Sequence, residues 1–193
     1  MTISSFKPPR RTLMGPGPSD VSQRVSEAMA RPTIGHLDPY FIGMMDEIKS
    51  LLQYAFQTDN ELTFAVSAPG SAGMECCFAN LVEPGDTVIV CQNGVFGSRM
   101  KENVERFGGM AIMVQDDWGR AVDESKLEAA LKANPEAVLV AFVHAETSTG
   151  VQSDAAKLVR LAHDHDCLTI VDAVTSLAGT PIYVDKWGID AIY

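Results

Sequence analysis

Residues 137–174 read AVLVAFVHAETSTGVQSDAAKLVRLAHDHDCLTIVDAV and are the part of the sequence that says most about the topology. It holds an apolar run of strand length at 137–143, a segment of helical length at 154–166 and a second apolar run at 168–174. Parallel strands need a long crossover connection between them, usually a helix. The stretch therefore predicts two parallel strands joined by a helix.

The same alternation continues on both sides of this stretch. Further apolar runs lie at 62–67 (LTFAVS), 87–92 (TVIVCQ), 110–114 (MAIMV) and 190–193 (DAIY), with segments of helical length at 72–82, 96–108 and 123–134. Repeated strand–helix alternation predicts an α/β fold with a mainly parallel sheet and helices on both of its faces.

The N-terminal part has a different character. Prolines at 8, 9, 16 and 18 with glycines at 15 and 17 exclude a helix there, so we expect an extended N-terminal arm over residues 1–18. Helices are expected at 21–30, capped by Ser19 or Asp20, and at 41–56, where apolar residues recur at helical spacing. Residues 19–193 are predicted to form one domain.

Bulk properties narrow the classes of partner. The net charge is −10, and no long cluster of Lys and Arg is present. We expect neither nucleic acid nor a membrane as partner, because phosphate neutralisation needs clustered positive charge and the apolar run 137–143 is too short to span a bilayer. Four cysteines without a C-x-x-C pattern and no apolar leader in residues 1–11 indicate a reduced, cytoplasmic protein.

Ligands of open parallel sheets bind beyond the carboxyl ends of the strands, so the turns after strands are the places to search. In SAPGSAGME (67–75), glycines at 70 and 73 allow close backbone approach at a helix start. Free N–H groups at Ser71 and Ala72 would suit a phosphate. A glycine-rich turn without a ligand is the alternative.

In QNGVFGSR (92–99), Phe96 follows a strand between glycines 94 and 97. Its ring could stack on a flat cofactor, or it could simply pack inward at the start of a helix. The spacing leaves both open.

The third turn, HAETSTG (144–150), has four hydrogen-bonding residues in succession, Glu146 to Thr149. One such residue suffices to cap the next helix, so the excess favours a ligand site.

The fourth turn contains Asp172 at the end of the apolar run 168–174. A buried carboxylate needs a partner, and a protonated ring nitrogen would be one. Capping of a turn or binding of backbone amides is the alternative.

Two other features are interpreted as structural. HDHD (163–166) looks like the polar end of a helix and not a metal site, because residues two apart do not share a helix face. The pair Cys76–Cys77 looks like part of the core, since a reactive thiol needs an electropositive site. No metal is expected.

Taken together, these motifs resemble one family. LMGPGPSDV, GHLDP, LVEPGDTV, NGVFGSR, HAETSTG and VDAVTSLAGTPI are similar to segments of the class V, fold-type I pyridoxal-phosphate enzymes, nearest to the alanine–glyoxylate and serine–pyruvate (serine–glyoxylate) aminotransferases. The resemblance covers almost the whole chain, and HAETSTG and VDAVTSLAGTPI are its most specific motifs.

The resemblance implies pyridoxal 5′-phosphate as the cofactor and a role for each matching residue. Asp172 would pair with the pyridinium nitrogen, Phe96 and Val174 would cover the two ring faces, and Thr147 would bond near the ring hydroxyl. Gly70, Ser71 and Ala72 would hold the phosphate, although the turn departs from the S-G-S-G-H form common in the family. Gly17 and His36 would lie near the substrate.

The family's cofactor-binding lysine would fall about five positions past Tyr193, and the small domain and the substrate-binding arginine would follow. None of the lysines present takes its place, and Lys186 is interpreted as a surface residue. We therefore expect the 193-residue chain alone to be inactive, and the whole protein to be a homodimer with sites completed across the subunit interface.

The activity that the resemblance implies is transfer of an amino group from alanine or serine to glyoxylate or pyruvate. Two alternatives are enzymes of the same class, a ureidoglycine–glyoxylate aminotransferase and, less in keeping with Phe96 and the TSTG run, a cysteine desulfurase. A third, from a different class, is a non-catalytic α/β binding module.

Overall fold

The structure is a computed structural model that describes residues 5–193. The chain divides into two compact units, of which the first ends at Ile42 and the second is Gly43–Tyr193. In the first unit, residues 5–22 form neither helix nor strand, as the prolines predict, and α1 follows at Gln23–Met29.

The predicted cap of α1 is wrong. Ser22 is the residue that precedes the helix, and its side chain makes no capping hydrogen bond. Asp20 is turned away, because its Oδ2 accepts a hydrogen bond from the backbone N–H of Leu13 at 3.3 Å. The next helix, α2 (Pro39–Phe56), contains the boundary between the two units.

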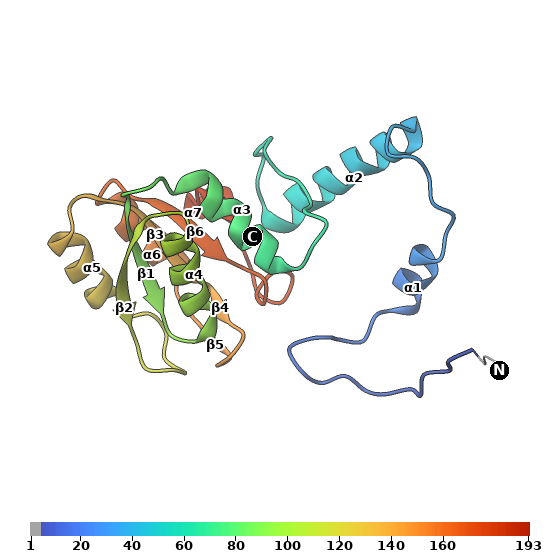
Figure 1. Ribbon diagram of the computed structural model, residues 1–193, viewed down its shortest axis with the longest axis horizontal. Coiled ribbons are helices and arrows are strands. Elements are labelled where there is room, and N and C mark those ends of the chain that lie inside the picture. Colours follow the sequence, from blue (N-terminus) through green and yellow to red (C-terminus); the bar gives the residue numbers. More distant parts are fainter. Residues whose placement is uncertain (1–4) are drawn as a thin grey trace. The chain divides into compact units, whose positions relative to one another are not determined.

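A five-stranded parallel sheet is the centre of the second unit (Figure 1). Its strands lie in the order β2 (Met110–Gln115), β1 (Thr87–Gln92), β3 (Ala137–Val143), β6 (Leu168–Asp172) and β7 (Ala191–Ile192). All four neighbouring pairs are parallel, which confirms the predicted sheet. A short antiparallel pair, β4 (Ala145–Glu146) with β5 (Val151–Gln152), follows β3.

Helices cover both faces of this sheet, as predicted (Figure 1). Alternate residues of the strands face two apolar cores. One core packs against α5 (Glu124–Ala133), α6 (Ala155–His163) and the short α7 (Val184–Trp187), and the other against α3 (Gly70–Leu81) and α4 (Val95–Arg106). Strands buried on both faces explain why the sequence shows continuous apolar runs.

The run at 62–67 is not a strand, contrary to the prediction. A strand needs a neighbour for its backbone hydrogen bonds, and within residues 5–193 none pairs with this run. Leu62 and Phe64 are accordingly 82% and 56% exposed.

Surface features follow the sequence in most respects. HDHD is the end of α6, since Asp164 is the residue after the last helical position. There His163 Nε2 lies 2.9 Å from Asp190 Oδ2. Lys186 is exposed, and its ammonium lies 5.3 Å from the centre of the Tyr183 ring.

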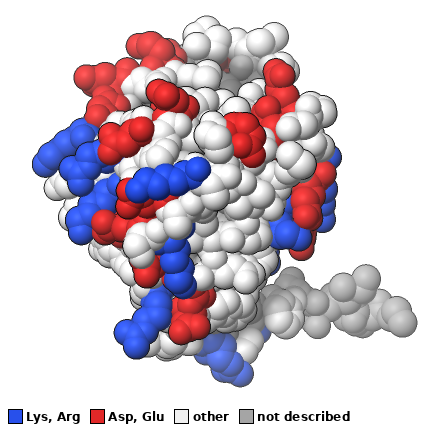
Figure 2. All heavy atoms as spheres, turned by 90° about the vertical axis from the view of Figure 1, so that its left-hand side faces the viewer, with Lys and Arg blue, Asp and Glu red and all other residues white. Residues whose placement is uncertain are grey.

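Charges of both signs are mixed on the face seen in Figure 2, and there Lys and Arg do not gather into a patch of their own. Within residues 5–193, no three His, Cys, Asp or Glu side chains are grouped as metal ligands. The helices of this part of the chain are also too short or too polar to cross a bilayer.

Candidate active site

The four turns singled out in the sequence are connected by direct contacts in the second unit. Glu146 Oε2 accepts a hydrogen bond from the backbone N–H of Phe96 at 3.2 Å. The hydroxyls of Thr147 and Thr175 are hydrogen-bonded to each other. Val174 follows Asp172 and packs against Gly70. The turns after β1, β3 and β6 and the start of α3 therefore form one region at the carboxyl edge of the sheet.

Asp172 is the last residue of β6 and is only 3% exposed. Its Oδ1 accepts a hydrogen bond from the backbone N–H of Val174 at 2.9 Å. The buried hydroxyl of Tyr193 is the other polar neighbour of this carboxyl. Burial raises the pKa of this carboxyl to about 6, against the opposing effects of the hydrogen bonds from the Val174 N–H and the Tyr193 hydroxyl. Asp172 is thus a buried acid at the carboxyl edge of the sheet, whose ionised form a positively charged partner would stabilise.

Tyr193 adjoins this acid. Its backbone N–H donates to Val171 O at 3.2 Å, and its carbonyl accepts from Ala173 N–H at 2.8 Å. The hydroxyl is buried and has no hydrogen-bond partner of normal geometry within residues 5–193. Burial, followed by the charge of Asp172, raises the pKa of Tyr193, so the phenol stays protonated.

Gly70 and Val174 touch each other closely. A Cβ on Gly70 would lie 2.7 Å from Val174 Cγ2, which is closer than two such carbons approach. Val174 itself is 55% exposed, so one side of its isopropyl group faces open space. The glycine predicted for phosphate binding and the valine predicted for ring contact are therefore neighbours.

The start of α3 has free hydrogen-bond donors. Pro69 precedes the helix and has no side chain that could cap it. The backbone N–H groups of Gly70 and Ser71 make no hydrogen bond to residues 5–193, whereas Ala72 N–H donates to Pro69 O at 2.8 Å. Gly70 and Ser71, rather than Ala72, thus offer N–H groups to an anion at the positive end of a 12-residue helix.

Phe96 is the second residue of α4 and is half-buried. The guanidinium carbon of Arg99 lies 4.7 Å from the ring centre, a cation–π distance. Arg99 therefore occupies one ring face, and only the opposite face is available for stacking.

Glu146 and Ser148 of the polar turn cap α4 from a distance in sequence. Glu146 is fully buried; its Oε1 accepts from the backbone N–H and the hydroxyl of Ser148 at 3.1 and 2.8 Å. Ser148 Oγ in turn accepts from Val95 N–H at 3.0 Å. Two of the four polar residues in this turn therefore accept hydrogen bonds from the first N–H groups of α4. The expectation that all but one of the four would be available to a ligand is wrong.

The other two residues of the turn differ from these. Thr147 bonds Thr175, which follows Val174. Thr149 Oγ1 is buried and lacks a partner within residues 5–193. Polar groups in excess of the capping requirement are thus present, although fewer than the sequence suggested.

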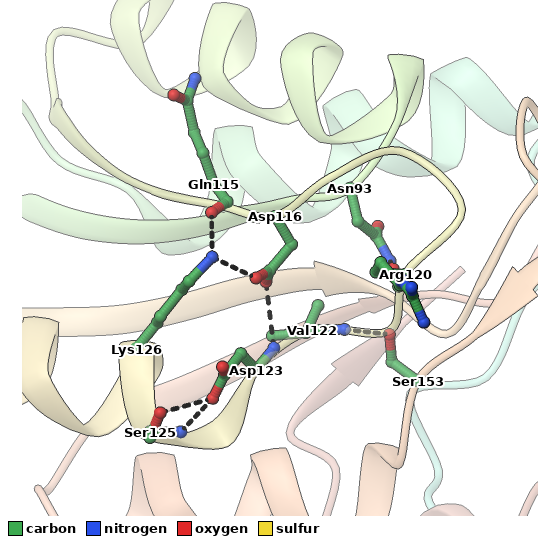
Figure 3. A network of polar contacts seen from close by, with 9 residues as sticks. All are labelled: Asn93, Gln115, Asp116, Arg120, Val122, Asp123, Ser125, Lys126 and Ser153. Atoms are coloured by element: carbon green, nitrogen blue, oxygen red, sulfur yellow. Dashed lines mark hydrogen bonds and ion pairs between the residues drawn. The ribbon is translucent and has the colours of Figure 1, made fainter.

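The turn before Phe96 is also held by the loop between β2 and α5 (Figure 3). Asn93 Nδ2 donates to Arg120 O at 2.9 Å, and Ser153 Oγ accepts from Val122 N–H at 3.1 Å. Asp116 accepts from the ammonium of Lys126 at 2.7 Å and from the backbone N–H at position 123 at 3.0 Å. The Asn93 bond joins the loop to the turn before α4, and the other bonds hold the loop to α5 and to the segment after β5.

A row of three hydrogen-bonded side chains, of which His144 and Ser176 are buried and Gln152 is exposed, lies beside β6. Gln152 Nε2 lies 3.1 Å from His144 Nε2, and His144 Nδ1 lies 2.9 Å from Ser176 Oγ. Because an amide nitrogen only donates, the neutral imidazole accepts at Nε2 and carries its proton at Nδ1. Burial lowers the pKa of His144, partly offset by Asp154. These hydrogen bonds hold Ser176 and, with it, the preceding residues Val174 and Thr175.

Gly17 and His36 belong to the first unit. Their expected place near the substrate stays a prediction. Cys77 packs half-buried against the core of the α3 and α4 face, and burial raises the pKa of its thiol to about 11. Its contacts fit the interpretation of this cysteine as a core residue.

Sequence reasoning missed Glu146 as a cap and Gly94 as its contact. Gly94 precedes α4 in an extended conformation, and a Cβ there would lie 2.3 Å from Glu146 Cγ. The glycine in NGVF was the signal for such a close approach, but its partner is 52 residues further along the chain.

Comparison with known proteins gives a consistent result. The family model for class-V aminotransferases matches residues 18–193. The alanine–glyoxylate aminotransferase of Oryctolagus cuniculus is 43% identical over 185 residues, which are 96% of this chain and 47% of that protein. The (S)-ureidoglycine–glyoxylate transaminase of Bacillus subtilis is 38% identical over 95% of this chain and 44% of its own length.

The fold agrees with a solved structure of the same group. The crystal structure of an alanine–glyoxylate aminotransferase from Nostoc sp. superimposes with a TM-score of 0.95 at 42% identity. The superposition covers the whole of this chain and 51% of that one. The chain therefore spans about half the length of the relatives it matches.

Proposed function

The chain belongs to the class-V aminotransferases, and from this premise we propose that the whole protein uses pyridoxal phosphate to transfer an amino group from a small amino acid to a 2-oxo acid. The observation that carries the proposal is Asp172, a buried carboxyl with a raised pKa at the carboxyl end of β6. A buried acid of this kind gains most from a cationic partner, and a protonated pyridine nitrogen is such a partner.

The residues of this region fit the three parts of pyridoxal phosphate. Its phosphate suits the free N–H groups of Gly70 and Ser71 at the start of α3. The start of α4 is less suitable, because the carboxylate of Glu146 already occupies it. The ring nitrogen suits Asp172, and the flat ring suits the free face of Phe96 with Val174 on the other side.

When bound, pyridoxal phosphate supplies an electron sink for the charge left on a substrate carbon that loses a proton. Asp172 holds a proton at the ring nitrogen and so maintains the positive charge that makes the sink effective. Phe96 and Val174 hold the ring plane and exclude water from its faces. Thr147, already bonded to Thr175, would offer its hydroxyl to the ring's own hydroxyl.

We propose alanine or serine as the amino donor and glyoxylate or pyruvate as the acceptor. The names of the relatives support alanine with glyoxylate in particular. Full-length protein supplied with pyridoxal phosphate, alanine and glyoxylate should form pyruvate and glycine in equal amounts. A protein that binds no pyridoxal phosphate and forms no pyruvate would point to a non-catalytic α/β module.

Ureidoglycine is a second candidate donor, favoured by the 38% identity to the Bacillus subtilis transaminase. The two candidates separate in a competition assay with glyoxylate as the common acceptor. If alanine is the donor, a tenfold excess of ureidoglycine leaves pyruvate formation largely unchanged, whereas strong inhibition with conversion of ureidoglycine favours the second candidate. Gly17 and His36 are our candidates for substrate contact, so His36→Ala should raise KM for the donor.

A homodimer is the proposed assembly. Apolar side chains of the second unit are exposed on α2 (Leu51, Tyr54) and on the segment that follows it (Leu62, Phe64). Exposed apolar surface of this kind is typical of an interface. Sedimentation of the full-length protein should give twice the monomer mass, and a monomer at micromolar concentration would contradict this assembly.

A further inference from the structure

Glu146 lies outside the set of residues assigned above to the cofactor, yet it is fully buried and tied to one of them. Its two oxygens accept from Phe96 N–H at 3.2 Å and from the backbone N–H and hydroxyl of Ser148. Within residues 5–193 it forms no salt bridge. This carboxylate is therefore stabilised by hydrogen-bond donors and by the positive end of α4.

The position of Glu146 is important because Phe96 lies in the first turn of α4. Phe96 is the second residue of α4, so its backbone N–H is one of those that no helical carbonyl can satisfy. Gly94, the residue before the helix, has no side chain to serve as a cap. Without Glu146 and Ser148, the first turn of α4 would have to find water or unwind, and Phe96 would move with it.

The backbone at the start of α4 has little conformational freedom. The backbone at Gly94 is so close to Glu146 that a Cβ would lie 2.4 Å from the carboxyl carbon and 2.6 Å from Ser148 Oγ. Val95 N–H is held by that same Ser148 Oγ at 3.0 Å. The N–H groups of two consecutive peptides, Gly94–Val95 and Val95–Phe96, are thus held by residues of the turn after β3.

We propose that Glu146 is a positioning residue, which holds the Phe96 ring where the cofactor ring stacks on it, by capping α4 from the neighbouring strand. The inference rests on the proposed function, because it presupposes that a cofactor binds beside Phe96. Glu146 does not touch the reacting atoms in this account. It acts through the backbone of Phe96.

The test uses the full-length protein and variants at both ends of the cap. Glu146→Gln keeps the shape of the side chain but replaces one of its two acceptor oxygens by an NH2 group. This group is a hydrogen-bond donor and would face another donor, either the Phe96 N–H or Ser148. Ser148→Ala removes the hydroxyl that links Val95 to Glu146, and Ser148→Thr restores a hydroxyl. Asp123→Ala is the matched control, because Asp123 caps α5 through Ser125 N–H at 2.8 Å and contacts none of the residues assigned to the cofactor.

Two properties are measured besides melting temperature. In the cofactor-free protein, hydrogen exchange at the Phe96 N–H should become roughly tenfold faster in Glu146→Gln. In titrations with pyridoxal phosphate, Glu146→Gln and Ser148→Ala should bind about tenfold more weakly and lose part of the circular dichroism of the bound cofactor. Ser148→Thr should recover both, and Asp123→Ala should change only the melting temperature.

Each outcome decides one of the two proposals. If Glu146→Gln lowers the melting temperature but binds pyridoxal phosphate with unchanged affinity and dichroism, Glu146 is only a structural cap and the inference is overturned. If the unaltered protein itself binds no pyridoxal phosphate, the proposed function fails instead. Faster exchange at Phe96 together with weaker cofactor binding supports both.

Discussion

Gly94 and Glu146 are in such close contact that no side chain fits between them: a Cβ on Gly94 would lie 2.3 Å from Glu146 Cγ. Gly94→Ala should therefore destabilise the full-length protein by about 1–3 kcal/mol, the usual cost of overpacking. Urea unfolding measures this cost.

The contact can be isolated by a double-mutant cycle with Glu146→Ala. Removing the Glu146 side chain makes room, so Gly94→Ala should cost at least about 0.5 kcal/mol less in that background. Additive effects of the two changes would show that the glycine is needed for another reason.

Asp172 should make the cofactor-free protein less stable as pH rises. Its folded-state pKa of about 6 lies above the usual value of 3.8, so the unfolded chain releases this proton first. The stability that the group contributes is present below pH 4 and is lost as pH rises through 6. The full loss is roughly 3 kcal/mol.

Asp172→Asn removes this titration and keeps an acceptor for Val174 N–H. The difference in unfolding free energy between the variant and the parent should grow in favour of the variant between pH 4 and 7 and then level off. A constant difference across this range would mean that Asp172 is not buried as an acid.

His144 should have the opposite dependence. Burial lowers its folded-state pKa below 6.5, so the unfolded chain takes up the proton first. The stability from neutral His144 is complete above pH 6.5 and is lost as pH falls toward the folded-state pKa. His144→Gln should lack this loss, as followed by the urea midpoint from pH 7.5 to 5; identical profiles would place the imidazole in water.

Phe96 should contribute to cofactor affinity through its free ring face. Phe96→Ala is expected to weaken pyridoxal phosphate binding about tenfold, since aromatic stacking contributes about 0.5–1.5 kcal/mol beyond the area it buries. Phe96→Trp should bind at least as tightly as the parent, because the indole offers more area and is the better partner for the Arg99 cation. Cofactor titration followed by absorbance decides this, and unchanged affinity in Phe96→Ala would remove Phe96 from the site.

The fold could be predicted from the sequence because strands buried on both faces appear as unbroken apolar runs. That rule located β1, β3 and β6, and an apolar run also marked the edge strand β2, of which only Val114 is buried. It failed at 62–67, where the residues have strand character but no neighbouring strand among residues 5–193. Strand formation depends on a partner as well as on composition.

The sequence predicted which turns contain the candidate site, but not the contacts between those turns. The end of a parallel strand is a known ligand position, and this was enough to single out Asp172 and Phe96. The cap formed by Glu146 could not be foreseen, because it joins turns after two neighbouring strands that are 50 residues apart in the chain. Likewise, the Ala72 N–H is not available to a phosphate because it donates to Pro69 O, and this bond depends on the detailed conformation of the turn before α3.

The protonation state of the cofactor's ring nitrogen shows whether Asp172 pairs with that nitrogen. Full-length protein loaded with ring-15N pyridoxal phosphate is measured by nitrogen NMR near neutral pH, beside the Asp172→Asn variant. We predict a protonated nitrogen in the parent and an unprotonated one in the variant. An unprotonated nitrogen in the parent, or the same shift in both proteins, would contradict the pairing of Asp172 with the ring.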